Sequence, residues 1–95
     1  MKNSYLVRIE LHNADWPDDY DVLHKAMTKL GFGHTIKADD GRSYRLPTAE
    51  YAATTNHTID QVRQFAKQAT EATGRKSIVL VVKYVAWAGT GMESA

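Results

Sequence analysis

Cysteine is absent from this sequence of 95 residues. Its absence excludes disulfide bridges, thiol nucleophiles and metal sites built on thiolates. Long apolar segments are missing too, because no run approaches the roughly 18 residues of a membrane span and no apolar signal region opens the chain. These absences predict a soluble protein of a reducing compartment, the cytoplasm.

Net charge is also small. Twelve Lys and Arg against eleven Asp and Glu leave a formal charge of +1, far from the strongly basic composition of a dedicated nucleic-acid binder. Any role with nucleic acid therefore depends on local clustering of cations. Hydrophobic residues make up 43% of the chain and charged residues 24%, which is typical of a folded chain rather than a disordered one. The length fits a single domain, residues 1–95.

The spacing of apolar residues predicts six elements. Val7, Ile9 and Leu11 alternate with polar residues, as in a half-buried strand. Later apolar residues recur every three to four positions in two stretches, which indicates two helices. The expected strands cover residues 4–11, 32–37, 49–55 and 77–87, and the expected helices run from Pro17 to about Leu30 and from Ile59 to near Thr73.

Capping residues support both helices. Either Asp15 or Asp18 is suited to begin the first helix, and Gly31 to end it in a left-handed conformation. Thr58 with Gln61 fits a capping box at the start of the second helix.

The order strand, helix, strand, strand, helix, strand is that of the ferredoxin-like βαββαβ fold, an α+β two-layer sandwich. Its antiparallel sheet has the strand order 4-1-3-2. Residues 39–48 are expected to form a long loop rather than a tight hairpin, with a turn at 39–41. The alternative within this loop is a short strand continuation at 43–46, which Pro47 interrupts. Residues 88–95 are expected to form a flexible tail. This fold supports many unrelated activities, so it predicts no function by itself.

The last predicted strand is apolar on both faces, with Ile78, Leu80 and Val82 on one and Val79 and Val81 on the other. In the expected sheet this strand lies at an edge, and helices cover only one face. An uncovered apolar edge promotes aggregation. We therefore predict a homodimer that buries the helix-free face, the final strand, or both. The alternative is that the strand packs against its own tail.

Two histidines are candidates for catalysis. His12 follows the first strand and His57 lies in the turn before the second helix. Imidazoles change charge near neutral pH, so one ring can take the proton of an RNA 2′-hydroxyl while the other protonates the leaving oxygen. Arg42 or Arg45 is the candidate for holding the phosphate. The alternative is that His12 is a solvated strand end and His57 a turn residue that helps to cap the helix.

The other two histidines are expected to be structural. His34 shares a face with Phe32 and Ile36, which favours a histidine satisfied within the core. His24 lies beside Leu23 and is expected to be a partly exposed helix residue.

Acidic residues offer a weak case for a metal ion. Glu10, His12 and Asp15 are close in sequence, and Asp39 with Asp40 present carboxylate oxygens. Asp-Asp-Gly is more typical of a turn, however. We expect no metal and no other cofactor.

A basic and aromatic group lies in or beside the predicted loop: Lys37, Arg42, Tyr44 and Arg45. Cations contact phosphates, and tyrosine rings stack on unpaired bases. This group therefore predicts an RNA-binding site. Neighbouring acidic residues dilute its charge, so a plain solvated loop is the alternative.

The segment 18–55 resembles the GhoS family, the small antitoxins of type V toxin–antitoxin systems. The residues that carry the resemblance are Asp19-Tyr20, Gly31-Phe32, Ile36-Lys37-Ala38-Asp39-Asp40-Gly41, Leu46-Pro47, Tyr51 and Thr54-Thr55. The family has a ferredoxin-like fold similar to that of the CRISPR-associated Cas2 proteins.

The resemblance implies an endoribonuclease that cleaves single-stranded messenger RNA. Cas2-type proteins hold a metal with an acidic residue at the end of the first strand, and the nearest residue here, Glu10, is out of register with it. No catalytic residue is carried over by the resemblance. The alternative function is a non-enzymatic interaction module whose dimer surface is its only developed site.

Overall fold

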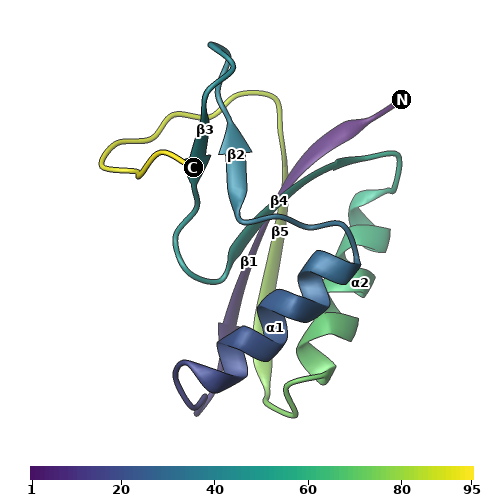
Figure 1. The fold of residues 1–95 in the computed structure, drawn as a ribbon. Coiled ribbons are helices and arrows are strands. Elements are labelled where there is room, and N and C mark those ends of the chain that lie inside the picture. The colour runs from purple at the N-terminus through teal and green to yellow at the C-terminus, as the bar shows by residue number, and fades with distance from the viewer.

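The computed structural model describes residues 1–95 as a three-stranded sheet, a separate two-stranded hairpin and two helices (Figure 1). The strands are β1 (Asn3–Leu11), β2 (Thr35–Lys37), β3 (Ser43–Arg45), β4 (Glu50–Thr55) and β5 (Ser77–Tyr84), and the helices are α1 (Asp18–Lys29) and α2 (Ile59–Glu71). The α+β class predicted from the sequence is confirmed.

The strand β1 lies in the middle of the larger sheet and pairs antiparallel with β4 and β5. Its alternate residues Tyr5, Val7, Ile9 and Leu11 are all buried. They face α1 and α2, which cover one side of the sheet and leave the other without a helix (Figure 1). The alternation of apolar and polar residues in β1 therefore corresponds to a face buried under the helices and a face without a helix.

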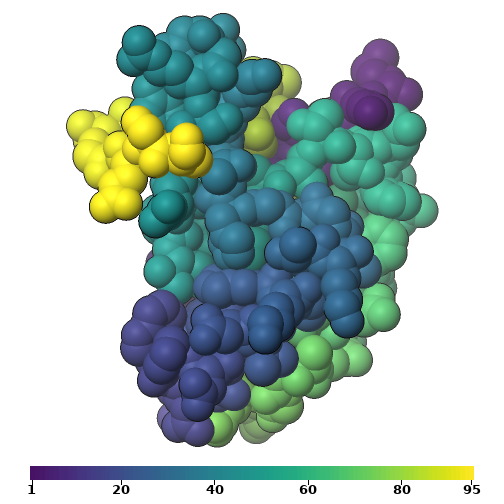
Figure 2. Space-filling view, in the orientation of Figure 1, coloured from purple at the N-terminus to yellow at the C-terminus, as the bar shows by residue number.

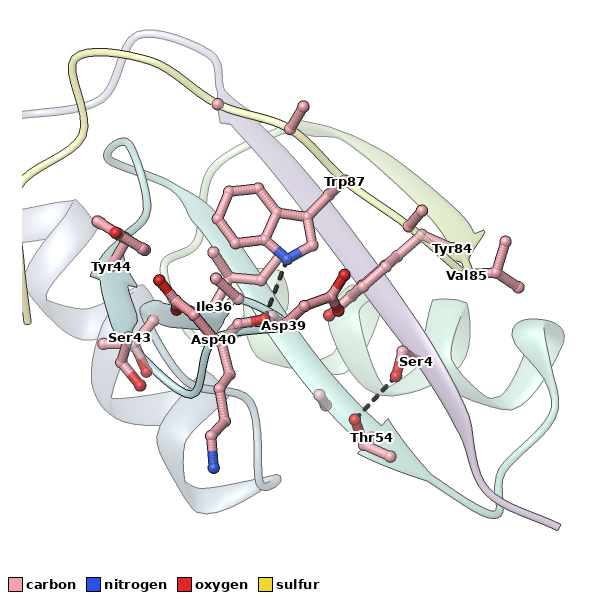
Figure 3. A pocket seen from close by; sticks show the side chains of 18 residues that line it. Ser4, Ile36, Asp39, Asp40, Ser43, Tyr44, Thr54, Tyr84, Val85 and Trp87 are labelled. Carbon is pink, nitrogen blue, oxygen red and sulfur yellow. Dashed lines mark hydrogen bonds between the residues drawn. The ribbon is translucent and has the colours of Figure 1, made fainter.

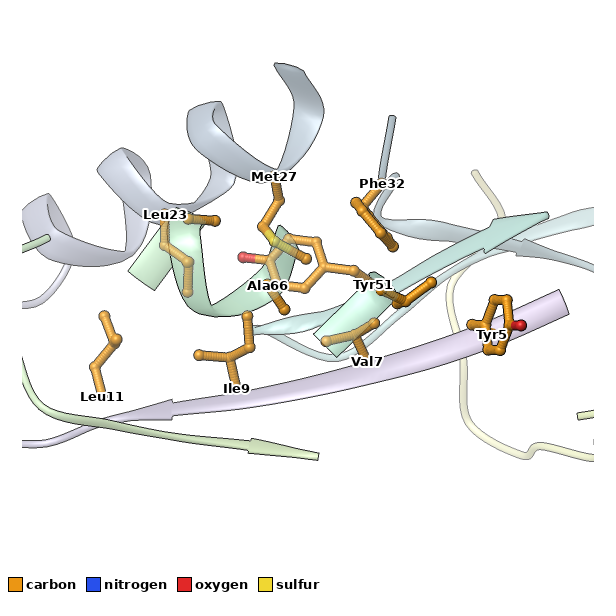
Figure 4. Close-up of a cluster of buried hydrophobic side chains, with 11 residues drawn as sticks. Tyr5, Val7, Ile9, Leu11, Leu23, Met27, Phe32, Tyr51 and Ala66 are labelled. Carbon is orange, nitrogen blue, oxygen red and sulfur yellow. The ribbon is translucent and has the colours of Figure 1, made fainter. Parts of the chain in front are cut away.

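The core lies between the sheet and the helices (Figure 4). Leu23 and Met27 come from α1, Val62 and Ala66 from α2, and the fully buried Tyr51 from β4. Full burial of one large apolar side chain stabilises the fold by about 1.5–3 kcal/mol. Both helices and β1 and β4 therefore share one core, against which Val79 and Val81 of β5 pack partly buried.

The two helices begin in different ways. Thr58 and Gln61 form the predicted capping box at the start of α2. At α1 neither predicted cap is used, since Pro17 occupies the cap position and makes no side-chain bond. Instead the Asp19 carboxylate, in the first turn, accepts from the Asp15 N–H at 2.8 Å.

The predicted sheet order 4-1-3-2 is found only in part: predicted strands 4, 1 and 3 are neighbours as β5, β1 and β4, but predicted strand 2 is not in this sheet. The predicted strand 32–37 contacts β4 only at one bridge, where Gly33 and Ala52 exchange hydrogen bonds of 3.0 and 2.9 Å. Beyond Gly33 the chain leaves the sheet, and β2 pairs with β3 instead.

The predicted long loop 39–48 is wrong for residues 39–45, which belong to a hairpin, and the alternative of a short strand at 43–46 is found as β3. The Ala38 N–H donates to the Arg42 carbonyl at 2.8 Å, and the Gly41 N–H donates to the Ala38 carbonyl at 3.0 Å. Gly41 has a φ of +87°, which glycine adopts without strain. The Asp-Gly turn thus connects β2 to β3 in a tight hairpin, whose ladder consists of three residue pairs.

The last strand ends at Tyr84, before the predicted limit at Trp87. The segment 88–95, expected to be a flexible tail, returns to lie beside β3 (Figure 1). Two backbone hydrogen bonds join it there, from the Arg45 N–H to the Glu93 carbonyl (2.8 Å) and from the Ala95 N–H to the Ser43 carbonyl (3.0 Å). The tail thus forms a third, irregular part of the hairpin region.

Candidate nucleic-acid interface

A groove of about 960 Å³ lies between the β2–β3 hairpin and the adjoining ends of β4, β1 and β5 (Figure 3). The chain that follows β5 forms one of its sides. Figure 2 shows the hairpin and the C-terminal tail standing together above the body that carries the helices. The groove is open, so an extended chain has access to it.

Aromatic side chains from separate segments line this groove. Tyr44 comes from β3, Tyr84 from the end of β5 and Trp87 from the chain that follows. The Trp87 Nε1–H donates to the Lys37 carbonyl at 3.0 Å. The rings of Trp87 and Tyr44 have centroids 6.2 Å apart and planes at 75°. Edge-to-face contact and the indole hydrogen bond hold both rings at the wall of the groove.

Charged groups of both signs also line the groove. Lys37, from β2, is the one cation in its lining, and Asp39 and Asp40 follow it in the hairpin turn. A lysine ammonium suits a phosphate as a point charge. The carboxylates are hydrogen-bond acceptors for the amino groups of bases. The groove therefore carries the chemistry for bases as well as for one phosphate.

The other two predicted RNA-binding cations lie on the hairpin outside this lining. Arg42 pairs with Asp40 at 3.8 Å, and Arg45 pairs with Glu93 of the tail at 3.7 Å. All four side chains are largely exposed. Exposed ion pairs contribute about 0–1 kcal/mol, so a phosphate competes readily for either guanidinium.

The structure does not bring the predicted acid and base together. His12 follows β1, where its N–H donates to the Lys76 carbonyl at 2.8 Å. His57 lies by the other end of β1, where its carbonyl accepts from the Tyr5 hydroxyl at 2.8 Å and its ring contacts Phe65. The nine residues of β1 span roughly 30 Å. One phosphate cannot contact both imidazoles of a single chain.

The acidic residues near His12 have a structural role. Arg75 donates through Nη2 to the Asp15 carboxylate at 3.0 Å and through Nε to the Asp19 carboxylate at 2.8 Å. The hydrogen bond from the Asp15 N–H, aided by Arg75, lowers the pKa of Asp19. No three His, Asp or Glu side chains converge as ligands for a metal ion.

A histidine cluster that the sequence did not reveal joins α1, the segment before β2, and β4. The Nδ1 atom of His24 lies 2.6 Å from the Tyr51 hydroxyl. The ring of His34 contacts both, with centroids 4.3 Å from His24 and 4.9 Å from Tyr51. His24 and Tyr51 are 27 positions apart in sequence, and no helix or strand spacing relates the three residues. They meet because β4 lies beside Gly33 in the folded chain.

Burial governs the protonation of this cluster. It lowers the pKa of His24, with a further lowering from His34, and it lowers the pKa of His34 itself. Burial also raises the pKa of Tyr51. Both imidazoles are therefore neutral at pH 7, and the phenol keeps its proton. A neutral His24 with its proton on Nε2 accepts from the Tyr51 hydroxyl through Nδ1.

Comparison with known proteins adds no relative: no family model matches the chain, and no curated protein matches it. Neither helix is long and apolar enough to cross a membrane.

Proposed function

We propose that this protein binds single-stranded RNA in the groove between the β2–β3 hairpin and the sheet. The observation that carries the proposal is the aromatic pair of Tyr44 and Trp87 in the groove, and Lys37 of the adjoining strand β2 adds one cation to the same lining. Base stacking on an aromatic ring stabilises a complex by about 1–3 kcal/mol and tolerates any base sequence.

The mixed charge of the groove favours unpaired bases over a duplex. Asp39 and Asp40 repel a continuous line of phosphates but accept hydrogen bonds from base amino groups. In a duplex those groups and the faces of the bases are engaged. The backbone of the bound strand is then expected on the hairpin, where Arg42 and Arg45 offer exposed guanidinium groups.

Cleavage of the bound RNA is the enzymatic form of this proposal, and the resemblance of segment 18–55 to the antitoxin family supports it. An endoribonuclease antitoxin acts in the cytoplasm, where messenger RNA and a reducing environment coincide. Single-chain catalysis by His12 and His57 together is not part of the proposal, because β1 separates them. In this form of the proposal the groove is the site of cleavage, and Lys37, the one cation in its lining, would stabilise the phosphorane.

Binding is measured through the indole of Trp87. The sequence contains two tryptophans, and a Trp16→Phe protein keeps Trp87 as its only one. We expect a single-stranded oligonucleotide to quench its fluorescence, and a duplex of the same sequence to quench it far less. Binding through phosphates is expected to weaken steeply between about 50 and 200 mM salt.

Matched variants test the location. Tyr44→Ala removes a groove ring, whereas Trp16→Ala removes an aromatic ring that is 65% exposed at the far end of the molecule. We expect the first to weaken RNA binding by about 5- to 150-fold and the second to leave it unchanged. Equal binding by both variants, or no quenching at all, overturns the proposal.

Cleavage is measured separately with a labelled single-stranded RNA, with and without EDTA, beside His12→Ala and Lys37→Ala. Loss of cleavage with Lys37→Ala alone supports chemistry in the groove. The same faint cleavage by every variant indicates a contaminant and leaves an RNA-binding protein that is not a nuclease.

A further inference from the structure

The most exposed apolar side chains of the sheet lie together on β5. Ile78, Leu80 and Val82 are 54%, 57% and 40% exposed, and all three point to the helix-free face. A row of three such residues on one strand is uncommon on a monomer's surface and marks a contact with another molecule.

Beside this row the helix-free face is mixed, with Leu6 of β1 and Ala52 of β4 next to Val82 and charged side chains farther along the strands. Arg8 in β1 lies between Leu80 of β5 and Glu50 of β4, and Glu10 lies opposite Ile78. Burying the whole face against a second sheet would desolvate these charges at several kcal/mol each. The contact is therefore centred on β5 at the edge of the sheet, where the apolar side chains are.

The outer edge of β5 also has free backbone groups. The His12 N–H donates to the Lys76 carbonyl. In the register of β1 and β5 this bond shows which residues of β5 exchange hydrogen bonds with β1. Antiparallel ladders bond alternate residues, so the even-numbered residues of β5 bond to β1. The N–H and carbonyl groups of Ser77, Val79, Val81 and Lys83 then point away from the sheet, where β5 has no other neighbour.

We infer that two copies of this chain associate through β5, antiparallel and edge to edge, about a two-fold axis at Leu80. The four outward-facing residues then pair completely among themselves, Val79 with Val81 of the second copy and Ser77 with Lys83. On the helix-free face, Leu80 lies opposite Leu80 of the second copy, and Ile78 lies opposite Val82. The two sheets become one sheet of six strands.

The length of β5 selects this register among its neighbours. Centred on Val79, the pairing would put Lys83 opposite Arg75 of the second copy, which lies before the strand and donates to Asp15 and Asp19 of its own chain. Centred on Val81, it would pair Ser77 with Val85, which lies beyond the strand. Only the register centred on Leu80 pairs all four outward-facing residues with one another, so the strand is complementary to itself.

A chain without cysteine allows a direct test by single cysteine substitutions. Opposed residues that do not share hydrogen bonds have Cα atoms about 4.5 Å apart, within the range of a disulfide. We expect Leu80→Cys to form a disulfide-linked dimer on mild oxidation. Ile78→Cys alone lies about 13 Å from its own copy, four residues along the strand, and is expected to crosslink only when mixed with Val82→Cys.

Two further variants serve as controls. Arg8→Cys lies in the same row as Leu80 but on β1, so its two copies are about 14 Å apart across three strand spacings and are expected to stay unlinked. Leu80→Asp places two carboxylates together at the axis. We expect it to weaken the dimer by about tenfold or more while circular dichroism stays unchanged, because the Leu80 side chain is largely exposed.

Light scattering of the wild-type chain, from about 1 to 100 µM, gives the oligomeric state directly. A concentration-dependent dimer that Leu80→Asp dissociates supports the inference, together with the expected crosslinks. A monomer throughout, a dimer indifferent to Leu80→Asp, or equal crosslinking by Arg8→Cys and Leu80→Cys overturns it. None of these readouts involves RNA, so the inference stands or fails apart from the proposed function.

Discussion

The body of the molecule and its hairpin region are stabilised in different ways. In the body, β1, β4, α1 and α2 all contribute fully buried side chains to one core. In the hairpin region, Ile36 is the one buried residue of β2 and β3. Backbone hydrogen bonds from the tail and the indole bond of Trp87 connect that region instead.

This difference separates the region that determines stability from the region proposed to bind RNA. Burial of apolar area is the dominant favourable term in folding, so the core determines whether the chain folds. Exposed hydrogen bonds and ion pairs contribute much less and open at lower cost. A groove made by such a region can adjust to a flexible ligand without disturbing the core. Substitutions in the two regions should therefore affect different measurements.

The largest expected effect is in the body. Leu23→Ala removes a fully buried side chain of α1, and we expect the free energy of unfolding to fall by about 2–5 kcal/mol. Urea denaturation followed by circular dichroism measures it. A comparable loss from Trp87→Ala would contradict the separation of the two regions.

The second effect is in the groove. Trp87→Ala removes the ring that joins the tail to β2, and we expect single-stranded RNA binding to weaken by about 5- to 150-fold. The midpoint of thermal unfolding should change little, since the side chain is outside the core cluster. Trp87→Phe, which keeps an aromatic face, should retain part of the affinity.

The third effect is a pH dependence of the free energy of unfolding, which arises from histidines in the body of the molecule. The pKa values of His24 and His34 are lower in the folded chain than the usual 6.5, so the unfolded chain binds protons more tightly. The stability contributed by neutral rings is therefore complete above about pH 6.5 and declines as the pH falls toward the folded pKa values. Urea titrations at several pH values should show this slope, and His24→Gln with His34→Gln should flatten it. An unchanged slope would show that other groups cause it.

The smallest effect is at the tail. Glu93→Gln removes the partner of Arg45, whose ion pair is exposed, and stability should change by less than about 1 kcal/mol. At low salt, RNA binding should strengthen slightly, because the guanidinium no longer has a competing carboxylate. Unchanged or weaker binding would show that Arg45 does not contact phosphate.

Local patterns predicted much of this architecture. The alternation in β1 gave its buried face, and the capping box at Thr58 gave the start of α2. The candidate site was predicted in part, since Lys37 and Tyr44 do line the groove. Trp87 was assigned to the last strand, because nothing in its neighbours indicates that β5 ends at Tyr84 and the chain crosses to the hairpin.

The sequence by itself determined the elements that depend on neighbours in the chain. Periodicity decided the two helices and the strands β1, β4 and β5, and Asp-Asp-Gly decided that the chain turns at residues 39–41. Those signals are local because backbone conformation and amphipathic faces depend on residues a few positions apart.

Only the tertiary structure decided which segments meet. It took β2 away from the sheet to pair with β3, separated His12 from His57 along β1, and joined His24 to His34 and Tyr51. Contacts between distant residues follow from how strands pair and how the core packs. Neither can be predicted from the spacing of residues along the chain.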